Sequence, residues 1–222
     1  MRKFVPAYEG NLRKHALSVP RCISECSGIR VFGRRIKSLV FSTDVAIIKN
    51  INADAIIAVY PFTPQPAITQ AIIGVSEVPV VCGVGGGLTN GVRSASMAAY
   101  VEHQGAYGVV CNSKIGVETI HAIKDAVEIP VVYTVISENT DIQPYLTAGV
   151  DIINVSGAAR TPEIVGTLRQ RYPELPIIAT GGPTEESILA TIRAGANAIT
   201  YTPPSSASLF AKTMAGNRSE LE

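Results

Sequence analysis

The stretch ELPIIATGGPTEESILATIRAGANAITYTPPSS, residues 174–206, predicts a strand, a helix and a second strand in direct succession. The first strand is the short apolar run 175–180, which ends at a pair of glycines. Thr184 is a suitable N-cap for the helix, and Gly195 suits the left-handed position that closes it. Residues 197–202 then form the second strand. Two parallel strands joined by one short helix make a right-handed βαβ crossover.

Two kinds of strand entry recur along the rest of the chain. Glu-x-Pro followed by two β-branched residues occurs three times, beginning at Glu77, Glu128 and Glu174. A small or polar turn that leads into an apolar run occurs four times, at residues 53–57, 105–110, 149–153 and 195–199. With an additional first strand, the pattern predicts eight strands, at residues 36–43, 53–60, 78–84, 107–112, 129–136, 151–157, 175–180 and 197–202. Eight parallel strands alternating with helices predict a protein of the α/β class, a (βα)8 or TIM barrel.

The 222 residues suffice for one barrel domain with an N-terminal extension. We expect the barrel to occupy residues 36–222, and residues 1–35 to form a basic extension that packs on it. Within the extension, the apolar spacing of residues 8–19 predicts a helix that plugs the bottom of the barrel or packs on a partner. Residues 29–36, with Gly33 at their centre, are expected to form a small hairpin.

Composition supports a barrel whose strands are covered on both faces, because 46% of the residues are hydrophobic and only 17% are charged. No apolar run approaches the roughly 20 residues of a membrane helix, and the first residues lack the apolar core of a signal peptide. We therefore expect a cytoplasmic protein with no membrane partner. The four cysteines do not have a zinc-binding spacing, so reduced thiols are expected.

Charge is distributed unevenly along the chain. Residues 1–37 hold nine Lys or Arg against two acids, a net of +7, and the remainder holds ten against sixteen, a net of −6. One interpretation is that the basic side chains pair with acidic helices of the same or a neighbouring barrel, which would suit a homo-oligomer. The other is a patch for RNA or an anionic ligand. No aromatic residues are interleaved with the basic ones as stacking on single strands would require, so nucleic acid is not the expected partner.

The residues at the strand ends exclude several chemistries, because active sites of TIM barrels lie at the C-terminal ends of the strands. All three histidines fall on predicted helices, which argues against a zinc amidohydrolase. No pair of carboxylates follows two separate strands as a glycosidase would need. Neither predicted strand five nor strand six contains a lysine for a Schiff base, and Lys114 is the only lysine expected at this face. We expect no metal and no cofactor.

The last quarter of the chain resembles a known group of barrels. ELPIIATGG followed by IRAGANAITY is similar to the phosphate-binding (βα)8 barrels, which include thiamine-phosphate synthases, keto-deoxy-phosphogluconate aldolases, tryptophan-pathway barrels and sugar-phosphate epimerases. The resemblance implies a phosphate held by backbone N–H groups after strands seven and eight. By position, these belong to Gly181, Gly182, Ser205 and Ser206. The chain departs from the group at Pro203 and Pro204, which remove two donors where the group has Gly-Ser or Gly-Thr.

Three residues are candidates for catalysis. Lys114 is a candidate amine nucleophile or anion contact, and it could lower the pKa of the Cys111 thiol to give a thiolate. Glu138 is the best available general acid or base if apolar strand ends raise its pKa. The alternatives are a solvated lysine, a cysteine that packs in the barrel and a glutamate that faces solvent.

Other polar residues are candidates for ligand binding. Arg160, in the loop after strand six, could hold a phosphate or carboxylate with two hydrogen bonds. Asn154, Ser156 and Thr180 are expected to point into the upper barrel, where polar atoms need each other, water or a ligand.

Three functions remain open at this point. The first is a metal-independent enzyme of the lyase or isomerase type that acts on a small phosphorylated or carboxylated metabolite. The second is a metal-free hydrolase on the same barrel. The third is a barrel without catalysis that senses a ligand and signals through its basic N-terminus. The small number of acids and bases at the strand ends counts in favour of this third function.

Overall fold

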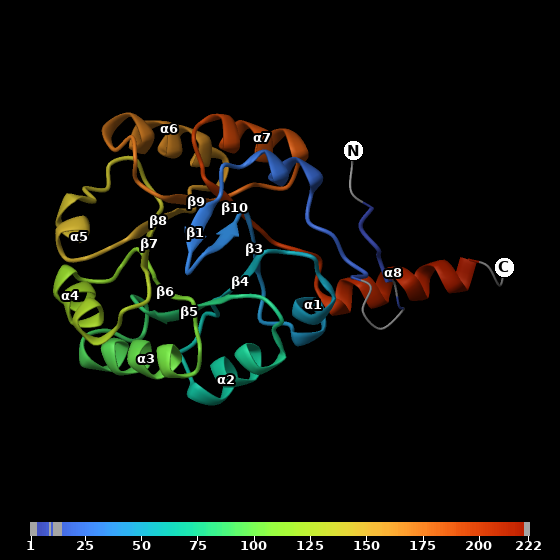
Figure 1. The fold of residues 1–222 in the computed structure, drawn as a ribbon, viewed down its shortest axis with the longest axis horizontal. Coiled ribbons are helices and arrows are strands. Elements are labelled where there is room, and N and C mark those ends of the chain that lie inside the picture. The colour runs from blue at the N-terminus through green and yellow to red at the C-terminus, as the bar shows by residue number, and fades with distance from the viewer. Residues whose placement is uncertain (1–3, 9, 11–14, 220–222) are drawn as a thin grey trace.

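Eight parallel strands close into a barrel in the computed structural model, which describes residues 4–8, 10 and 15–219 (Figure 1). The strands are β3 (Ser38–Phe41), β4 (Ala55–Ala58), β5 (Val80–Gly85), β6 (Gly108–Cys111), β7 (Val131–Val135), β8 (Ile152–Val155), β9 (Ile177–Thr180) and β10 (Ala198–Tyr201). β10 pairs in parallel with both β9 and β3, which closes the sheet. All eight predicted strands are confirmed, and so is the predicted (βα)8 barrel.

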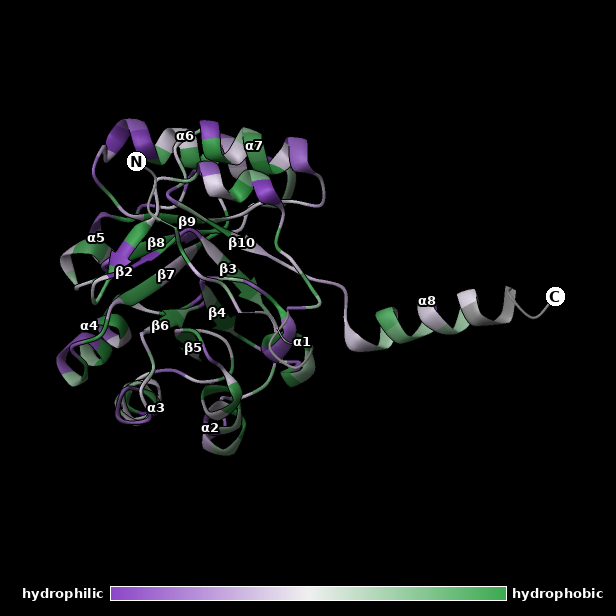
Figure 2. Cartoon of the chain, turned by 45° about the vertical axis from the view of Figure 1, so that its right-hand side comes forward, coloured by the Kyte–Doolittle hydropathy of each residue, from purple (hydrophilic) through white to green (hydrophobic). Residues whose placement is uncertain are grey.

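Helices surround the strands and follow them in sequence. They are α1 (Val45–Asn50), α2 (Pro66–Val75), α3 (Val92–His103), α4 (Val117–Ala126), α5 (Gln143–Thr147), α6 (Thr161–Arg171), α7 (Glu185–Arg193) and α8 (Ser206–Ser219), with the short 3-10 helix η2 (Ala158–Arg160) before α6. The predicted cap of α7 is present, because Thr184 and Ser187 form a capping box. α8 differs from the other helices in that it projects away from the barrel (Figures 1 and 2). No helix in the described part of the chain is long and apolar enough to cross a membrane.

The repeated strand entries have a common structural role. Asp151 accepts a hydrogen bond from the backbone N–H of Val131 at 2.8 Å, and Asn197 accepts one from Ile177 at 2.9 Å. Each donor directly follows the proline of a Glu-x-Pro repeat. The proline itself has no N–H, so the side chain from the next strand satisfies the first free donor after it. The two repeats in the sequence therefore fix the register of neighbouring strands at the bottom of the barrel.

Side chains along each strand point alternately outward and inward, which divides the core into two layers. Outward-facing strand residues pack against the helices in the larger cluster, as Val40, Ile153 and Ile199 do. Inward-facing residues fill the lower barrel in a second cluster, made up chiefly of Leu39, Ala55, Ile57, Val81, Val110, Val132, Ile152, Ile178 and Ala198. The central strands in Figure 2 are accordingly coloured mostly as hydrophobic, whereas the surrounding helices carry both hydrophobic and hydrophilic residues. The C-terminal ends of the strands are left to form the upper barrel.

A β-hairpin closes the bottom of the barrel. β1 (Ile29–Val31) and β2 (Arg34–Ile36) are antiparallel and are joined by a two-residue turn whose residues, Phe32 and Gly33, both have positive φ. The buried residues of this hairpin belong to the same cluster as the barrel interior. The predicted hairpin is confirmed. Its apolar face plugs the bottom of the barrel, a role that the sequence predicts for a helix over residues 8–19.

The remainder of the N-terminal extension differs from the predicted helix over residues 8–19. Residues 8, 10 and 15–19 are not helical, and residues 9 and 11–14 lie outside the described part of the chain. Leu17 instead forms a parallel β-bridge with Ile51, through backbone hydrogen bonds with Asn50 at 2.9 Å and Asn52 at 3.3 Å. The helical part of the extension is the 3-10 helix η1 (Arg21–Glu25), which packs on α7.

Basic residues of the hairpin region bind their own segment. Arg35 donates to the carbonyl oxygen of Ser27 at 2.7 Å, and Lys37 donates to that of Ser24. Arg34 lies over the ring of Tyr107, 5.7 Å from its centroid. Part of the positive charge of residues 1–37 therefore has a structural role at the bottom of the barrel.

Candidate active site

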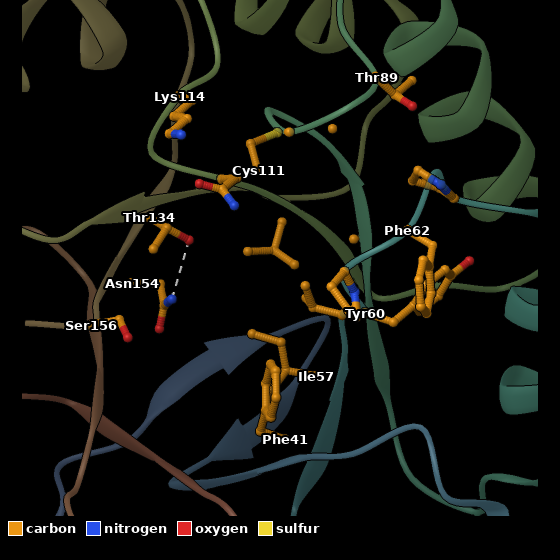
Figure 3. A pocket seen from close by; sticks show the side chains of 18 of the residues that line it. Phe41, Ile57, Tyr60, Phe62, Thr89, Cys111, Lys114, Thr134, Asn154 and Ser156 are labelled. Atoms are coloured by element: carbon orange, nitrogen blue, oxygen red, sulfur yellow. Dashed lines mark hydrogen bonds between the residues drawn. The ribbon is translucent and has the colours of Figure 1, made fainter. Parts of the chain in front are cut away.

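A cavity of about 630 Å³ opens at the C-terminal ends of the strands (Figure 3). Each of the eight strands contributes an inward-facing residue to it, namely Phe41, Ile57, Gly83, Val110, Thr134, Asn154, Thr180 and Thr200 in strand order, of which Ile57 and Val110 also belong to the apolar cluster below. The residues that follow these in the loops, among them Tyr60, Phe62, Lys114, Ser156 and Thr202, form the rim. The cavity therefore lies where TIM barrels carry their active sites.

The cavity wall has an apolar half and a polar half. β3 to β6 contribute Phe41, Ile57, Gly83 and Val110, whereas β7 to β10 contribute Thr134, Asn154, Thr180 and Thr200. Figure 3 shows Thr134, Asn154 and Ser156 along one side, with Phe41, Ile57, Tyr60 and Phe62 on the other. Such a wall suits a ligand with a polar end and an apolar body.

The polar half contains buried oxygen atoms without a partner. The Asn154 amide donates to Thr134 Oγ1 at 3.3 Å, and Thr180 Oγ1 donates to Ser156 Oγ at 3.4 Å. Asn154 Oδ1 and Thr200 Oγ1, in contrast, bond to nothing in the described part of the protein, although the two residues are only 8% and 5% exposed. Buried polar atoms normally have a hydrogen-bond partner, so these two oxygens are positioned for water or a ligand.

Lys114 is the only charged residue among the described residues that line the cavity. It lies in the loop between β6 and α4, on the side of the cavity that carries Thr134 and Asn154 (Figure 3). No hydrogen bond or ion pair joins its ammonium group to any residue in the described ranges. Lys114 therefore gives the cavity a positive charge with which no carboxylate of the described residues pairs.

Two stacked tyrosines hold the loop that carries Lys114. The rings of Tyr133 and Tyr145 are 4.0 Å apart and inclined by 9°. The Tyr133 hydroxyl donates to the carbonyl oxygen of Ser113 at 3.2 Å, and the Tyr145 hydroxyl donates to that of Ile115 at 3.1 Å. The residues on both sides of Lys114 are thus fixed by side chains from β7 and α5.

A glycine-rich segment after β5 forms another part of the rim. A Cβ atom at Gly86, which has φ +95°, would lie 2.7 Å from the backbone oxygen of Asn112. A Cβ atom at Gly85 would collide with the hydroxyl of Ser94, a buried residue of α3. The glycines therefore allow the β5 loop to lie directly against the end of β6 and the start of α3.

Cys111 lines the cavity but is completely buried in the layer between strands and helices. Burial raises the pKa of its thiol to about 12, so the group is protonated at neutral pH. The predicted thiolate is therefore corrected: Cys111 packs the barrel wall, and the nearby lysine does not offset its desolvation.

Glu138 and Arg160 form an ion pair outside the cavity lining. Arg160 also bonds to Glu163 Oε2 at 3.3 Å, so two carboxylates share one guanidinium group. A hydrogen bond from the backbone N–H of Glu138 and then the bond to Arg160 hold the pKa of the Glu138 carboxyl below its ordinary value. The sequence-based expectation of a raised pKa is wrong, because these hydrogen bonds to the ionised form outweigh the effect of desolvation.

The residues predicted to hold a phosphate do not line the cavity. A Cβ atom at Gly181 would lie 2.8 Å from side-chain atoms of Ile188 and Ile199, so this glycine permits close packing of β9 and α7. Gly182 follows it with φ +79°. The Ser205 hydroxyl bonds to that of Ser208 at 2.8 Å, and the Ser206 N–H donates to Asp44 Oδ2 at 3.1 Å. Of the predicted site residues, the structure brings Lys114, Cys111, Asn154, Ser156 and Thr180 together around the cavity.

Sequence reasoning missed most of the apolar wall and part of the polar one. Phe41, Ile57, Thr134 and Thr200 line the cavity, although the sequence predicts no more for them than a place in a strand. Alternation indicates their position, because each is two residues after an inward-facing residue of the lower barrel. Asn154 stands out in the sequence because it is a polar residue within an apolar strand.

Comparison with solved structures places the chain among TIM barrels. A putative phosphonomutase from Burkholderia cenocepacia J2315 superposes with a TM-score of 0.64 and 17% identity, covering 90% of this chain and 96% of that one. Phosphonopyruvate hydrolase in complex with oxalate and Mg²⁺ gives a TM-score of 0.63 and 16% identity, with 88% and 83% covered. 2,3-Dimethylmalate lyase, a member of the PEP mutase/isocitrate lyase superfamily, gives 0.64 and 13%, with 90% and 85% covered.

These similarities confirm the barrel fold. The neighbours include a phosphonomutase and a member of the PEP mutase/isocitrate lyase superfamily, which are not among the groups of phosphate-binding barrels that the last quarter of the sequence resembles. No protein-family model and no curated protein sequence matches the chain. One neighbour was solved with Mg²⁺, so the comparisons lend no support to the predicted metal independence.

The cavity residues do not form a suitable set of ligands for Mg²⁺. In proteins this ion is usually bound through one or two carboxylates. The described residues that line the cavity include hydroxyls, amides and one ammonium group but no carboxylate. Within the described ranges there is also no group of three or more His, Cys, Asp or Glu residues that could hold a metal ion. The described cavity therefore lacks the carboxylate ligands by which proteins usually hold Mg²⁺.

Proposed function

We propose that the protein is a small-molecule enzyme of the lyase or isomerase type, and that it binds an anionic metabolite in the cavity at the C-terminal ends of the strands. The observation that carries the proposal is the uncompensated charge of Lys114 at the edge of this cavity. An ammonium group in a partly enclosed site favours an anion, and anionic groups are common in metabolites. The structural neighbours agree with an enzyme, since they are named as a mutase, a hydrolase and a lyase.

The residues present suit electrostatic rather than acid–base catalysis. Lys114 would stabilise negative charge that develops on a carbonyl or carboxylate oxygen of the substrate. The side chains of Thr134, Asn154, Thr180 and Thr200 would orient the polar end, while the aromatic wall would exclude water from the apolar body. No imidazole or carboxylate lines the described cavity, so a proton would have to be transferred by Lys114, a hydroxyl group or the substrate itself.

The same lack of acids and bases supports a second candidate, a barrel that binds its ligand without converting it. A sensing barrel needs the charge of Lys114 and the shape of the cavity, but it does not need a group that exchanges protons with the ligand. The two candidates share the binding site and differ in turnover, which a single set of experiments can separate.

The test is calorimetric titration of the full chain with oxalate, phosphonopyruvate and inorganic phosphate, with EDTA and separately with Mg²⁺. We expect Lys114→Met to weaken the binding of at least one of these anions by about 10- to 100-fold, the usual contribution of a charge-assisted hydrogen bond. Lys212→Met, an exposed lysine of α8, should leave the affinity unchanged and is the matched control.

Turnover is followed in the same samples by NMR. Conversion of a bound anion that is abolished in Lys114→Met supports the enzyme, and binding without conversion of any anion that binds supports the sensor. Equal affinities for the wild type and Lys114→Met would contradict both.

A further inference from the structure

The two helix N-termini nearest the predicted phosphate site are already occupied by groups of the chain itself. At α8, the Ser206 N–H donates to Asp44 Oδ2 at 3.1 Å, and the same carboxylate accepts bonds from Ala46 and Ile47 through Oδ1 at 3.0 and 3.3 Å. Hydrogen bonding to Ser206 lowers the pKa of the Asp44 carboxyl, so it is ionised at neutral pH. The positive end of the α8 dipole therefore faces a carboxylate that belongs to the protein.

The N-terminus of α7 is satisfied in a similar way. Thr184 Oγ1 accepts from the Ser187 N–H at 3.2 Å, and Glu185 and Glu186 occupy the first turn. Between the two helices, Pro203 and Pro204 contribute no N–H groups. A doubly charged phosphate in this corner would meet the ionised Asp44 carboxylate and few free donors, which disfavours a phosphate site there.

The cavity itself offers one positive charge and two free oxygens. Lys114 can balance a single negative charge, as a carboxylate carries. Asn154 Oδ1 and Thr200 Oγ1, both more than nine-tenths buried and without a partner, face the cavity from β8 and β10. The Asn154 amide nitrogen already donates to Thr134 Oγ1. The amide oxygen, Oδ1, can only accept a hydrogen bond, so a ligand that binds here should offer it a donor.

We infer that the ligand is a carboxylate that bears a hydroxyl group and an apolar body, and not a phosphate ester. The carboxylate would bind Lys114, the hydroxyl would donate to Asn154 Oδ1 on β8, and the body would lie against Phe41, Ile57 and the rim aromatics. Thr200 Oγ1, two strands away on β10, would face the polar end of the ligand from the other side. The inference rests on the proposed function, since it assigns a chemical class to the ligand of the same cavity.

The experiment compares three probes that differ in one group each. 3-Phenyllactate has the carboxylate, the hydroxyl and an apolar ring; 3-phenylpropionate lacks the hydroxyl; phenethyl phosphate carries a phosphate in place of the carboxylate. We expect the wild-type chain to bind 3-phenyllactate about tenfold more tightly than 3-phenylpropionate, a factor that corresponds to one hydrogen bond. Phenethyl phosphate should bind more weakly than either, with EDTA or with Mg²⁺.

Variants identify the atoms responsible. Asn154→Leu and Thr200→Val keep the approximate shape of the side chains and remove the free oxygens. Each should lower the affinity for 3-phenyllactate toward that for 3-phenylpropionate while leaving the latter unchanged, which also shows that the variant is folded. Thr43→Val, a change at an exposed hydroxyl that does not line the cavity, is the control and should preserve the preference.

The result that overturns the inference is different from one that overturns the proposed function. Lys114-dependent binding with equal affinity for the first two probes, or with tighter binding of phenethyl phosphate, would refute the hydroxy-carboxylate class and leave an anion-binding cavity. Equal losses for both carboxylates in Asn154→Leu would show that this residue only shapes the cavity. Absence of Lys114-dependent binding for every anion would refute both proposals.

Discussion

Lys114 and Arg160 illustrate how the neighbours of a cation decide whether it is available to a ligand. Both residues follow barrel strands, and the sequence proposed each as an anion contact. Arg160 is shared by Glu138 and Glu163, so binding an anion would require breaking ion pairs. Lys114 has no such partner among the described residues and lines the cavity. The difference could not be inferred from the sequence, because Glu138 is 22 residues from Arg160 and the loop geometry decides the pairing.

The cysteines provide a test at the scale of single residues. All four are buried, and burial raises the pKa of Cys82 and Cys111 to about 12 each. We expect the native protein to react with less than one equivalent of Ellman's reagent at pH 7.5 over minutes, and with four equivalents in 6 M guanidinium chloride, because a thiol that is protonated and inaccessible does not exchange.

The alternative role of Cys111 can be tested by the same reaction. Rapid modification of one thiol in the native state that disappears in Cys111→Ser would restore the predicted reactive cysteine. Cys22→Ser serves as the comparison, since that thiol is also buried but lies in η1, against α7, and does not line the cavity.

At the scale of elements, the loop between β6 and α4 owes its position to its neighbours β7 and α5. Its own residues, Asn112 to Gly116, contain no helix or strand, yet the Tyr133 and Tyr145 hydroxyls bond to carbonyl oxygens on both sides of Lys114. The strands and most helices could be predicted, because apolar periodicity and turn residues are local properties of the sequence. The tyrosine contacts span 20 and 30 residues, and no local pattern indicates them.

Tyr145→Phe tests whether this contact positions Lys114. We expect the variant to bind the best anionic probe about three- to tenfold more weakly, since the loop loses one hydrogen bond of about 1 kcal/mol. In a Lys114→Met background the same change should have no further effect on affinity. Tyr172→Phe, which removes a hydrogen bond to Gln143 and none to the loop, is the control. Equal losses in both backgrounds would assign Tyr145 a purely structural role.

Asp44 connects α1 to the start of α8, and its contribution to stability depends on pH. The hydrogen bond to Ser206 lowers its pKa below the ordinary value of 3.8, so the folded state favours the ionised form. A depressed pKa stabilises the fold at pH values above 3.8, and this stabilisation is lost as the pH falls through the lower, folded-state pKa.

Urea unfolding of the wild type and Asp44→Ala should therefore show a difference of about 1 to 2 kcal/mol at pH 7, typical of a lost N-cap, and a smaller one at pH 3. Asp125→Ala, which removes an exposed ion pair with His121, should change stability by less than about 0.5 kcal/mol at both pH values. A difference for Asp44→Ala that is independent of pH would contradict the account of its charge.

At the scale of the whole molecule, the barrel interior is divided between a plugged bottom and an open top. The hairpin β1–β2 and the lower strand residues form one apolar cluster, while the upper layer turns polar from β7 to β10. The alternation of inward- and outward-facing residues makes the lower cluster predictable from the sequence. The sequence does not indicate that a hairpin from outside the barrel completes this cluster.

Three predictions remain for experiments in solution and in cells. Light scattering can check the predicted homo-oligomer, cell fractionation the cytoplasmic location, and salt-dependent RNA titration the lack of nucleic-acid binding.

Ile36→Ala measures the importance of the hairpin plug. Ile36 is 5% exposed and packs in the barrel interior, so we expect the free energy of unfolding to fall by about 2 to 4 kcal/mol. The matched control is Ile136→Ala, the same change at a position that is 56% exposed, for which we expect about 0.5 kcal/mol or less. Similar losses for the two variants in urea unfolding would show that the hairpin does not contribute to the core.

The central claim is that the ligand anion binds beside Lys114 and not in the phosphate position after β9 and β10. A crystal structure of the full chain soaked with 3-phenyllactate and, separately, with inorganic phosphate tests it most directly. We predict density for the carboxylate within about 3.2 Å of Lys114 Nζ, a hydrogen-bond distance, with the ring against Phe41 and Ile57. Density for either anion on the backbone of Gly181, Gly182 and Ser206, with Asp44 displaced and Lys114 free, would contradict the account.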